Sequence, residues 1–117
     1  MEYNPDVWVV FKVVNPSYKK PIYKVFAGWY GGYAGSDSWK MNSGITKVEE
    51  GEHTYSFHGC SGSTYVVPKA KQCYRMSGYM ASVWANFMEK LKDSDTTFEV
   101  LDENTDWFSL EYEYEKV

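Results

Sequence analysis

The segment VWVVFKVV, residues Val7–Val14, decides the fold of this chain. Valine and aromatic residues fill it and Lys12 is its one charged side chain, so the composition predicts a β-strand. A strand that is apolar on both faces belongs in the middle of a sheet. The sequence NPS at residues 15–17 is a turn signal, and we expect the chain to reverse there into a second strand over residues 22–27.

Further segments have the composition of strands, and each is bounded by glycine, proline or polar residues. They are residues 38–43, 45–50, 53–58, 63–67, 97–101 and 107–114. The second and third of these flank Gly51 and predict a hairpin. The last alternates large apolar side chains with serine and glutamate, which predicts a half-buried strand with an acidic outer face. By contrast, GWYGGYAG at residues 28–35 holds four glycines, and we do not expect it to form the interior of a strand or helix.

One segment has the periodicity of a helix. Between Ser77 and Lys92, apolar side chains recur every three or four residues, at Met80, Val83, Trp84, Phe87, Met88 and Leu91. Ser77 is a suitable N-cap. The predicted fold class is therefore α+β, with a mostly antiparallel β-sheet packed by one amphipathic helix (about residues 77–92) in two layers. A chain of 117 residues has the length of one domain, residues 1–117.

Charge is distributed unevenly along the chain. The net charge is −4 (12 Lys/Arg against 16 Asp/Glu), but residues 1–92 sum to +4 (11 against 7) and residues 93–117 sum to −8 (1 against 9). The acidic C-terminal region, residues 93–117, fits a solvated surface, and it also fits a segment that imitates a phosphate backbone. The basic body fits a site for an anionic ligand. Its lysines are too few and too dispersed for direct binding of duplex DNA.

Several classes of protein are not expected from this sequence. No apolar run approaches the roughly 20 residues that span a bilayer, and the N-terminus lacks the pattern of a signal peptide. We therefore expect a soluble, cytoplasmic protein without membrane contact. Cys60 and Cys73 are too few for a disulfide scaffold and are expected to be free thiols. Together with His53 and His58 they match no zinc-ligand spacing, so we expect no metal or other cofactor.

The motifs of common enzymes are also missing. Residues 59–62, GCSG, lack the spacing of a serine-hydrolase elbow, and no phosphate-binding loop of the NTPase type occurs. We therefore expect no enzyme. The alternative is a small thiol- or Ser-dependent enzyme acting through His58, Cys60 or Ser61, because His58 and Cys60 are two residues apart and share a face of an extended strand.

The segment GWYGGYAGSDSW, residues 28–39, has the composition of a binding loop. Large amphipathic rings give contact area at a low entropic cost, while serine and glycine adapt to a partner. Rings also stack on nucleobases, and Lys40, Lys69, Lys71 and Arg75 are candidates to contact phosphates. The predicted binding residues are Trp29, Tyr30, Tyr33, Ser36, Asp37, Trp39, Lys40 and Arg75. In the structural alternative, the rings fill the core and the glycines serve tight turns.

Four segments carry a resemblance to a known group. They are DVWVV at residues 6–10, KVFAGWYGG at 24–32, DSWKMNSGI at 37–45 and SGSTY at 61–65. Together they resemble a group of small uncharacterised proteins of tailed bacteriophages. The resemblance brings no catalytic residues. It implies an accessory protein that works in the host cytoplasm and binds a host component, in some cases one of host defence.

The predicted function is that of a non-enzymatic phage accessory protein. It binds and inhibits or sequesters a host factor through the aromatic, glycine-rich loop surface. Its partner is a host protein or a small anionic ligand, and one form of the hypothesis is a protein that sequesters a nucleotide signal. The remaining alternatives are the small enzyme described above and a homo-oligomeric structural module that pairs exposed strand edges.

Overall fold

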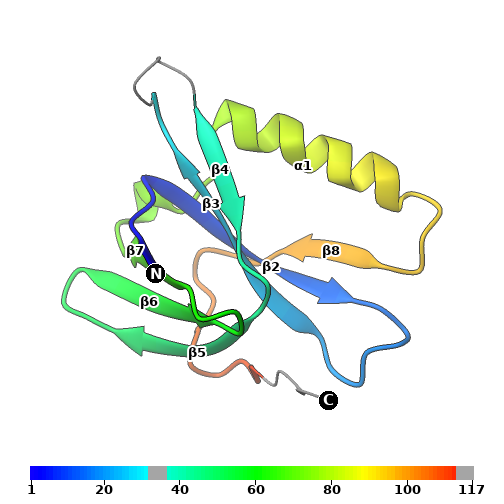
Figure 1. Cartoon of the computed structure of the whole chain (residues 1–117), viewed down its shortest axis with the longest axis horizontal. Helices are drawn as coiled ribbons and strands as arrows, with labels where there is room; N and C mark the ends of the chain where they lie inside the picture. Colours follow the sequence, from blue (N-terminus) through cyan, green and yellow to red (C-terminus); the bar gives the residue numbers. More distant parts are fainter. Residues whose placement is uncertain (32–36, 113–117) are drawn as a thin grey trace.

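The computed structural model of the chain describes residues 1–31 and 37–112, which form two four-stranded β-sheets and one α-helix (Figure 1). The central sheet has the order β4-β3-β2-β8 and is antiparallel throughout. Its strands are β2 (Val7–Val14), β3 (Ile22–Trp29), β4 (Ser38–Met41) and β8 (Thr97–Val100). The outer sheet has the order β1-β7-β6-β5, and only its β1–β7 pair is parallel. Its strands are β1 (Glu2–Tyr3), β5 (Ile45–Glu50), β6 (Thr54–Gly59) and β7 (Thr64–Pro68).

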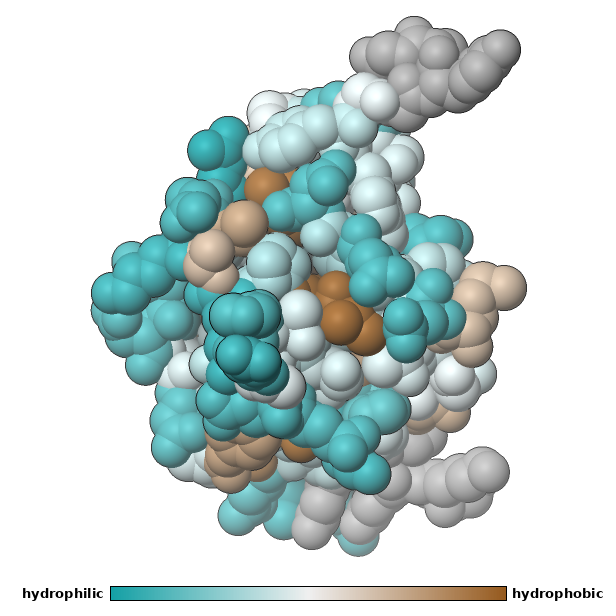
Figure 2. Space-filling view, turned by 90° about the vertical axis from the view of Figure 1, so that its left-hand side faces the viewer, coloured by the Kyte–Doolittle hydropathy of each residue, from teal (hydrophilic) through white to brown (hydrophobic). Residues whose placement is uncertain are grey.

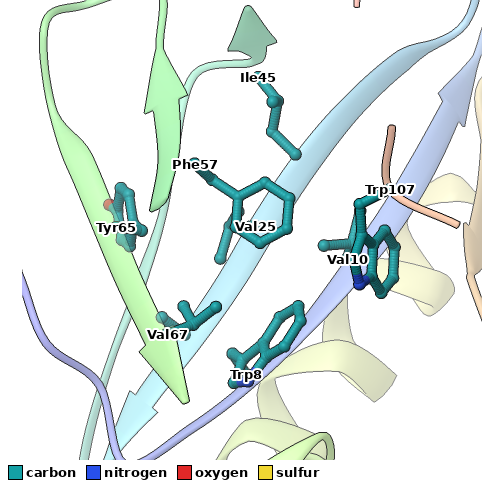
Figure 3. Packing of buried hydrophobic residues seen from close by; sticks show 9 residues of the cluster. Trp8, Val10, Val25, Ile45, Phe57, Tyr65, Val67 and Trp107 are labelled. Carbon is teal, nitrogen blue, oxygen red and sulfur yellow. The ribbon is translucent and has the colours of Figure 1, made fainter. Parts of the chain in front are cut away.

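The fold has three layers, so the expectation of two layers is wrong. Side chains of β2 alternate between its faces: Val7, Val9 and Phe11 pack with Met80 of helix α1 (Gly78–Leu91), while Trp8 and Val10 pack with the outer sheet. Figure 3 shows the second of these cores, between the sheets. One helix covers only one face of a sheet, and the apolar second face of β2 therefore needs the outer sheet.

Helix α1 begins as its sequence predicts. The Ser77 hydroxyl accepts a hydrogen bond from the Met80 backbone N–H at 3.1 Å, which confirms Ser77 as the N-cap. Farther along, the Trp84 ring contacts Phe11 and Phe26 of the central sheet, with ring centroids 5.1 and 6.0 Å apart. No helix in the described part of the chain is long and apolar enough to cross a membrane.

The start of the glycine-rich segment is part of a strand, contrary to expectation. Strand β3 continues through Gly28 to Trp29, and Gly28 pairs with Trp39 of β4. A Cβ atom at Gly28 would lie only 2.3 Å from the Met80 Sδ atom. Glycine is therefore used at this position to let α1 approach the strand closely, rather than to make a turn.

The predicted strand over residues 107–114 is wrong for its described part: residues 107–110 form a turn and a bend, and residues 111–112 are irregular. The Asp106 carboxylate accepts a hydrogen bond from Phe108 N–H, and the Asp106 carbonyl accepts one from Ser109 N–H. Such local bonds compete with strand pairing. Phe108, predicted on the buried face, is 50% exposed, whereas Leu110 and Tyr112 of the same predicted face pack against the inter-sheet core.

Ser109 and Glu111, the described residues of the acidic outer face predicted for that strand, are exposed. Glu111 lies 2.8 Å from Lys20 Nζ, and this contact lowers the pKa of the Glu111 carboxyl. Glu113 and Glu115 lie outside the described residues. The C-terminal segment is thus connected to the β2–β3 loop by an ion pair.

Two short elements hold the N-terminal end of β2 in place. No sequence pattern predicted either of them. Strand β1 pairs with β7, where the Tyr3 ring lies 5.1 Å from that of Tyr65. The 3₁₀-helix η1 (Lys71–Cys73) leads into Tyr74, which forms an isolated parallel bridge with Trp8. These contacts bring η1 against the edge of the inter-sheet core.

Candidate functional site

A pocket of about 260 Å³ lies where β2, β6, η1 and the loop after β8 meet. Its lining residues come from four distant parts of the sequence. They are Trp8, Tyr55, Lys69, Lys71, Tyr74, Glu103, Asn104, Thr105 and Trp107. The pocket combines aromatic rings with two lysines and one glutamate, a lining that suits a small polar ligand.

The aromatic rings of the pocket are held in fixed positions. Trp8 and Trp107 are almost fully buried, with their ring centroids 5.7 Å apart. The Trp8 ring also lies 4.8 Å from the Tyr74 ring, and its indole N–H donates to the Pro68 carbonyl at 2.9 Å. Trp8 and Trp107 thus form the floor of the pocket, and the ring surface left for a ligand belongs to Tyr55 and Tyr74, which are partly exposed.

The Tyr74 hydroxyl connects two backbone segments at the wall of the pocket. It donates to the Leu101 carbonyl at 2.5 Å and accepts from the Val10 N–H at 3.3 Å. Burial raises the pKa of Tyr74 to about 12, and the Asp102 and Glu103 carboxylates act in the same direction. The phenol therefore stays neutral and serves as a structural hydrogen-bond donor.

This pKa gives a stability prediction for Tyr74→Phe. A raised pKa means that the stabilisation by Tyr74 is fully present below its ordinary value of 10.0 and is lost as the pH rises toward about 12. We expect the variant to be less stable than the wild type by about 0.5–1.5 kcal/mol at neutral pH. The difference should shrink between pH 10.0 and about 12. Denaturant unfolding across this pH range measures it.

Tyr79→Phe is the matched control, because Tyr79 is exposed on α1. Its stability should follow that of the wild type at every pH. A stability difference for Tyr74→Phe that stays constant up to the alkaline limit would contradict the role given to this hydroxyl.

The two lysines at the pocket differ in whether a carboxylate already pairs with them. Lys69 Nζ lies 2.5 Å from the Glu50 carboxylate and 5.1 Å from the centre of the Tyr55 ring. Lys71 is exposed and has no ion-pair partner among residues 1–31 and 37–112. Glu103 is also exposed. An anionic group entering the pocket would therefore meet Lys71 as the cation that no carboxylate neutralises.

The loop between β8 and Trp107 has a defined shape. The Asp102 carboxylate accepts from Asn104 N–H at 2.7 Å, and the Asp102 carbonyl accepts from Thr105 N–H at 3.0 Å. The Thr105 hydroxyl donates to the same carbonyl at 2.6 Å. This turn carries Glu103, Asn104 and Thr105 to the pocket.

The structure does not bring the two predicted tryptophans of the glycine-rich loop together. Trp29 packs on the side of the outer sheet, with its ring 6.3 Å from Tyr3 and its indole N–H bonded to the Asn4 carbonyl. Trp39 packs on the helix side, with its ring 5.5 Å from Phe26 and 5.7 Å from Phe87. They lie on opposite faces of the central sheet, because Trp39 pairs with Gly28 and is offset by one residue from the partner of Trp29.

The remaining predicted binding residues have separate partners, although Lys40 and Trp29 both contact the Tyr3 ring. Asp37 accepts a hydrogen bond from the Gly31 N–H, and the exposed Tyr30 donates its N–H to Asp6. Lys40 lies 5.2 Å from the centre of the Tyr3 ring. Arg75 is exposed and uses its backbone N–H to bond the Trp8 carbonyl. Tyr33 and Ser36 lie outside the described residues.

The side chains of the alternative enzyme site point to other partners. The two ring nitrogens of His58 contact the Glu49 carboxylate at 2.5 Å and the Thr64 hydroxyl at 3.1 Å. The hydrogen bond from His58 lowers the pKa of Glu49. Cys60 Sγ instead lies 3.0 Å from the Ser43 hydroxyl. The arrangement does not place the imidazole as a base beside the thiol.

Comparison with known proteins gives no relative for this chain: no family model, curated protein or solved structure matches it significantly. Within the described residues, no group of three or more His, Cys, Asp or Glu side chains is placed to hold a metal ion. The pocket is therefore interpreted from its own geometry.

Proposed function

We propose that this protein is a non-enzymatic binding protein that sequesters a small anionic ligand with a flat ring, such as a nucleotide. The observation that carries the proposal is the pocket, where fixed aromatic rings lie together with Lys71, a cation that the described residues leave without an ion pair. Stacking on aromatic side chains holds a base, and a lysine holds a phosphate.

The size of the pocket limits the ligand. Pockets for drug-sized molecules have volumes of roughly 300–1,000 Å³, and this one has about 260 Å³. A single ring system with one anionic group fits such a volume better than a dinucleotide or a peptide segment. The resemblance to phage accessory proteins suggests the host cytoplasm as the source of the ligand.

The geometry gives less support to a host protein that binds at the glycine-rich loop. Trp29 and Trp39 cannot form one contact surface, because they lie on opposite faces of the central sheet. The face drawn in Figure 2, which includes the outer sheet, is largely hydrophilic, and its apolar atoms occur in small separate groups. A protein interface centred there would lack the apolar core that such interfaces have.

Native mass spectrometry followed by calorimetry tests the proposal. We expect the protein, after incubation with a mixture of nucleoside monophosphates, to retain one small mass that is released on denaturation. Lys71→Ala and Tyr55→Leu should each weaken binding by about tenfold or more, because they remove the free cation and a stacking surface. The loss with Lys71→Ala should diminish as salt increases, since added ions screen the same interaction in the wild type.

Two controls match these variants. Lys92→Ala removes an exposed lysine at the C-cap of α1, and Tyr79→Leu removes an exposed ring on that helix. Neither residue lines the pocket, so binding should be unchanged. Equal losses with test and control variants, or no retained nucleotide at all, would contradict the proposed function.

A further inference from the structure

The pocket presents a carboxylate as well as a cation to a ligand. Lys71 comes from η1, and Glu103 comes from the turn after β8. Tyr74 lines the same pocket between these two segments. A simple anion such as phosphate is attracted by Lys71 but repelled by Glu103, so its net electrostatic stabilisation is small. A ligand that suits both groups has hydrogen-bond donors away from its negative charge.

A carboxylate in the pocket would distinguish the nucleobases by their hydrogen-bond donors and acceptors. A carboxylate has two oxygens and accepts two parallel N–H bonds well. The Watson–Crick edge of guanine offers two adjacent donors, its ring N1–H and its exocyclic amine. Adenine has an acceptor at ring N1 beside one amine, so a carboxylate in the same place would face a lone pair. Asn104 lines the same wall, and its side-chain amide is a donor suited to the guanine carbonyl.

We infer that the pocket selects a guanine mononucleotide, with Glu103 as the residue that determines specificity and Lys71 as the contact to phosphate. The base stacks on Tyr55 or Tyr74, the pocket rings that are partly exposed, and its donor edge faces the turn that carries Glu103. This inference rests on the proposed function and deepens it, because it names the ligand class of the same pocket.

The affinities of guanosine monophosphate, adenosine monophosphate, uridine monophosphate and inorganic phosphate, measured by calorimetry, test the inference. We expect guanosine monophosphate to bind about tenfold more tightly than the other nucleotides, as is usual for a base read by two hydrogen bonds. Glu103→Gln should abolish this preference by weakening guanosine monophosphate alone, because an amide cannot accept two bonds. Inorganic phosphate should bind weakest to the wild type.

Glu99→Gln is the matched control, since Glu99 is exposed on β8 and does not line the pocket. It should keep the full preference for guanine. Nucleotides that bind with equal affinity, or a preference that Glu103→Gln leaves intact, would overturn this inference while the proposed function stands. Binding of none of the four compounds would overturn both.

Discussion

Replacing Trp107 by alanine is expected to lower the free energy of unfolding by about 3–5 kcal/mol. Trp107 is 3% exposed although it follows an exposed turn. Its ring lies 5.7 Å from Trp8, 5.9 Å from Phe57 and 5.8 Å from Tyr74, and it fills the space beside Val10 (Figure 3). These neighbours belong to both sheets and to the segment after η1, so they cannot all move inward to fill the cavity.

Phe108→Ala is the matched control for this prediction. Phe108 is the next residue and is also a large aromatic, but it is 50% exposed. Its replacement should change the free energy of unfolding by about 0.5 kcal/mol. Denaturant unfolding of both variants measures the contrast. Similar values for the two would mean that residues 107–112 do not pack in the orientation described.

Replacing Met80 by alanine is expected to cost about 2–5 kcal/mol, because the side chain is fully buried between α1 and the central sheet. Gly28→Ala should cost about 1–3 kcal/mol, because its new Cβ atom would overlap with the Met80 Sδ atom. The two losses should not add. Once Met80 is shortened, the overlap disappears and the added methyl group fills part of the cavity.

A double-mutant cycle tests this coupling. The four proteins are the wild type, Gly28→Ala, Met80→Ala and the double variant, and each is unfolded by denaturant. We expect the double variant to be no less stable than Met80→Ala alone. Additive losses would show that Gly28 is needed for another reason than its contact with α1. Gly78→Ala is the control for the added methyl group, since a Cβ atom there meets no other atom within 4 Å.

The sequence predicted the strands better than it predicted their assembly. The segment Val7–Val14 was expected to be a central strand and is one, because its composition reports burial on both faces. The same observation already called for a cover on each face, yet one helix and one sheet supply only one. The failure at residues 107–112 has a different cause: hydrogen bonds to Asp106 overrode an alternation typical of strands.

The pocket could not be predicted from local patterns. The pocket rings are far apart in the sequence. Trp8, Tyr55 and Trp107 lie in predicted strands, and Tyr74 lies in no predicted element. Lys69 and Lys71 were the only signal, as candidates to contact a phosphate. The composition of the glycine-rich loop predicted a binding surface. However, side chains alternate along β3 and β4, so its two tryptophans lie on opposite faces of the sheet.

The position of Trp107 also bears on when the chain can fold during its synthesis. The core between the two sheets includes the Trp107 ring, and β8, which pairs with β2, follows all the other strands in the sequence. Domains form as units once their contacts are available. The nascent chain therefore leaves the core on the Trp8 side of β2 incomplete until Trp107 has been synthesised. Ribosome-bound chains that end before Trp107 should be cut readily by protease, whereas released full-length protein should resist it.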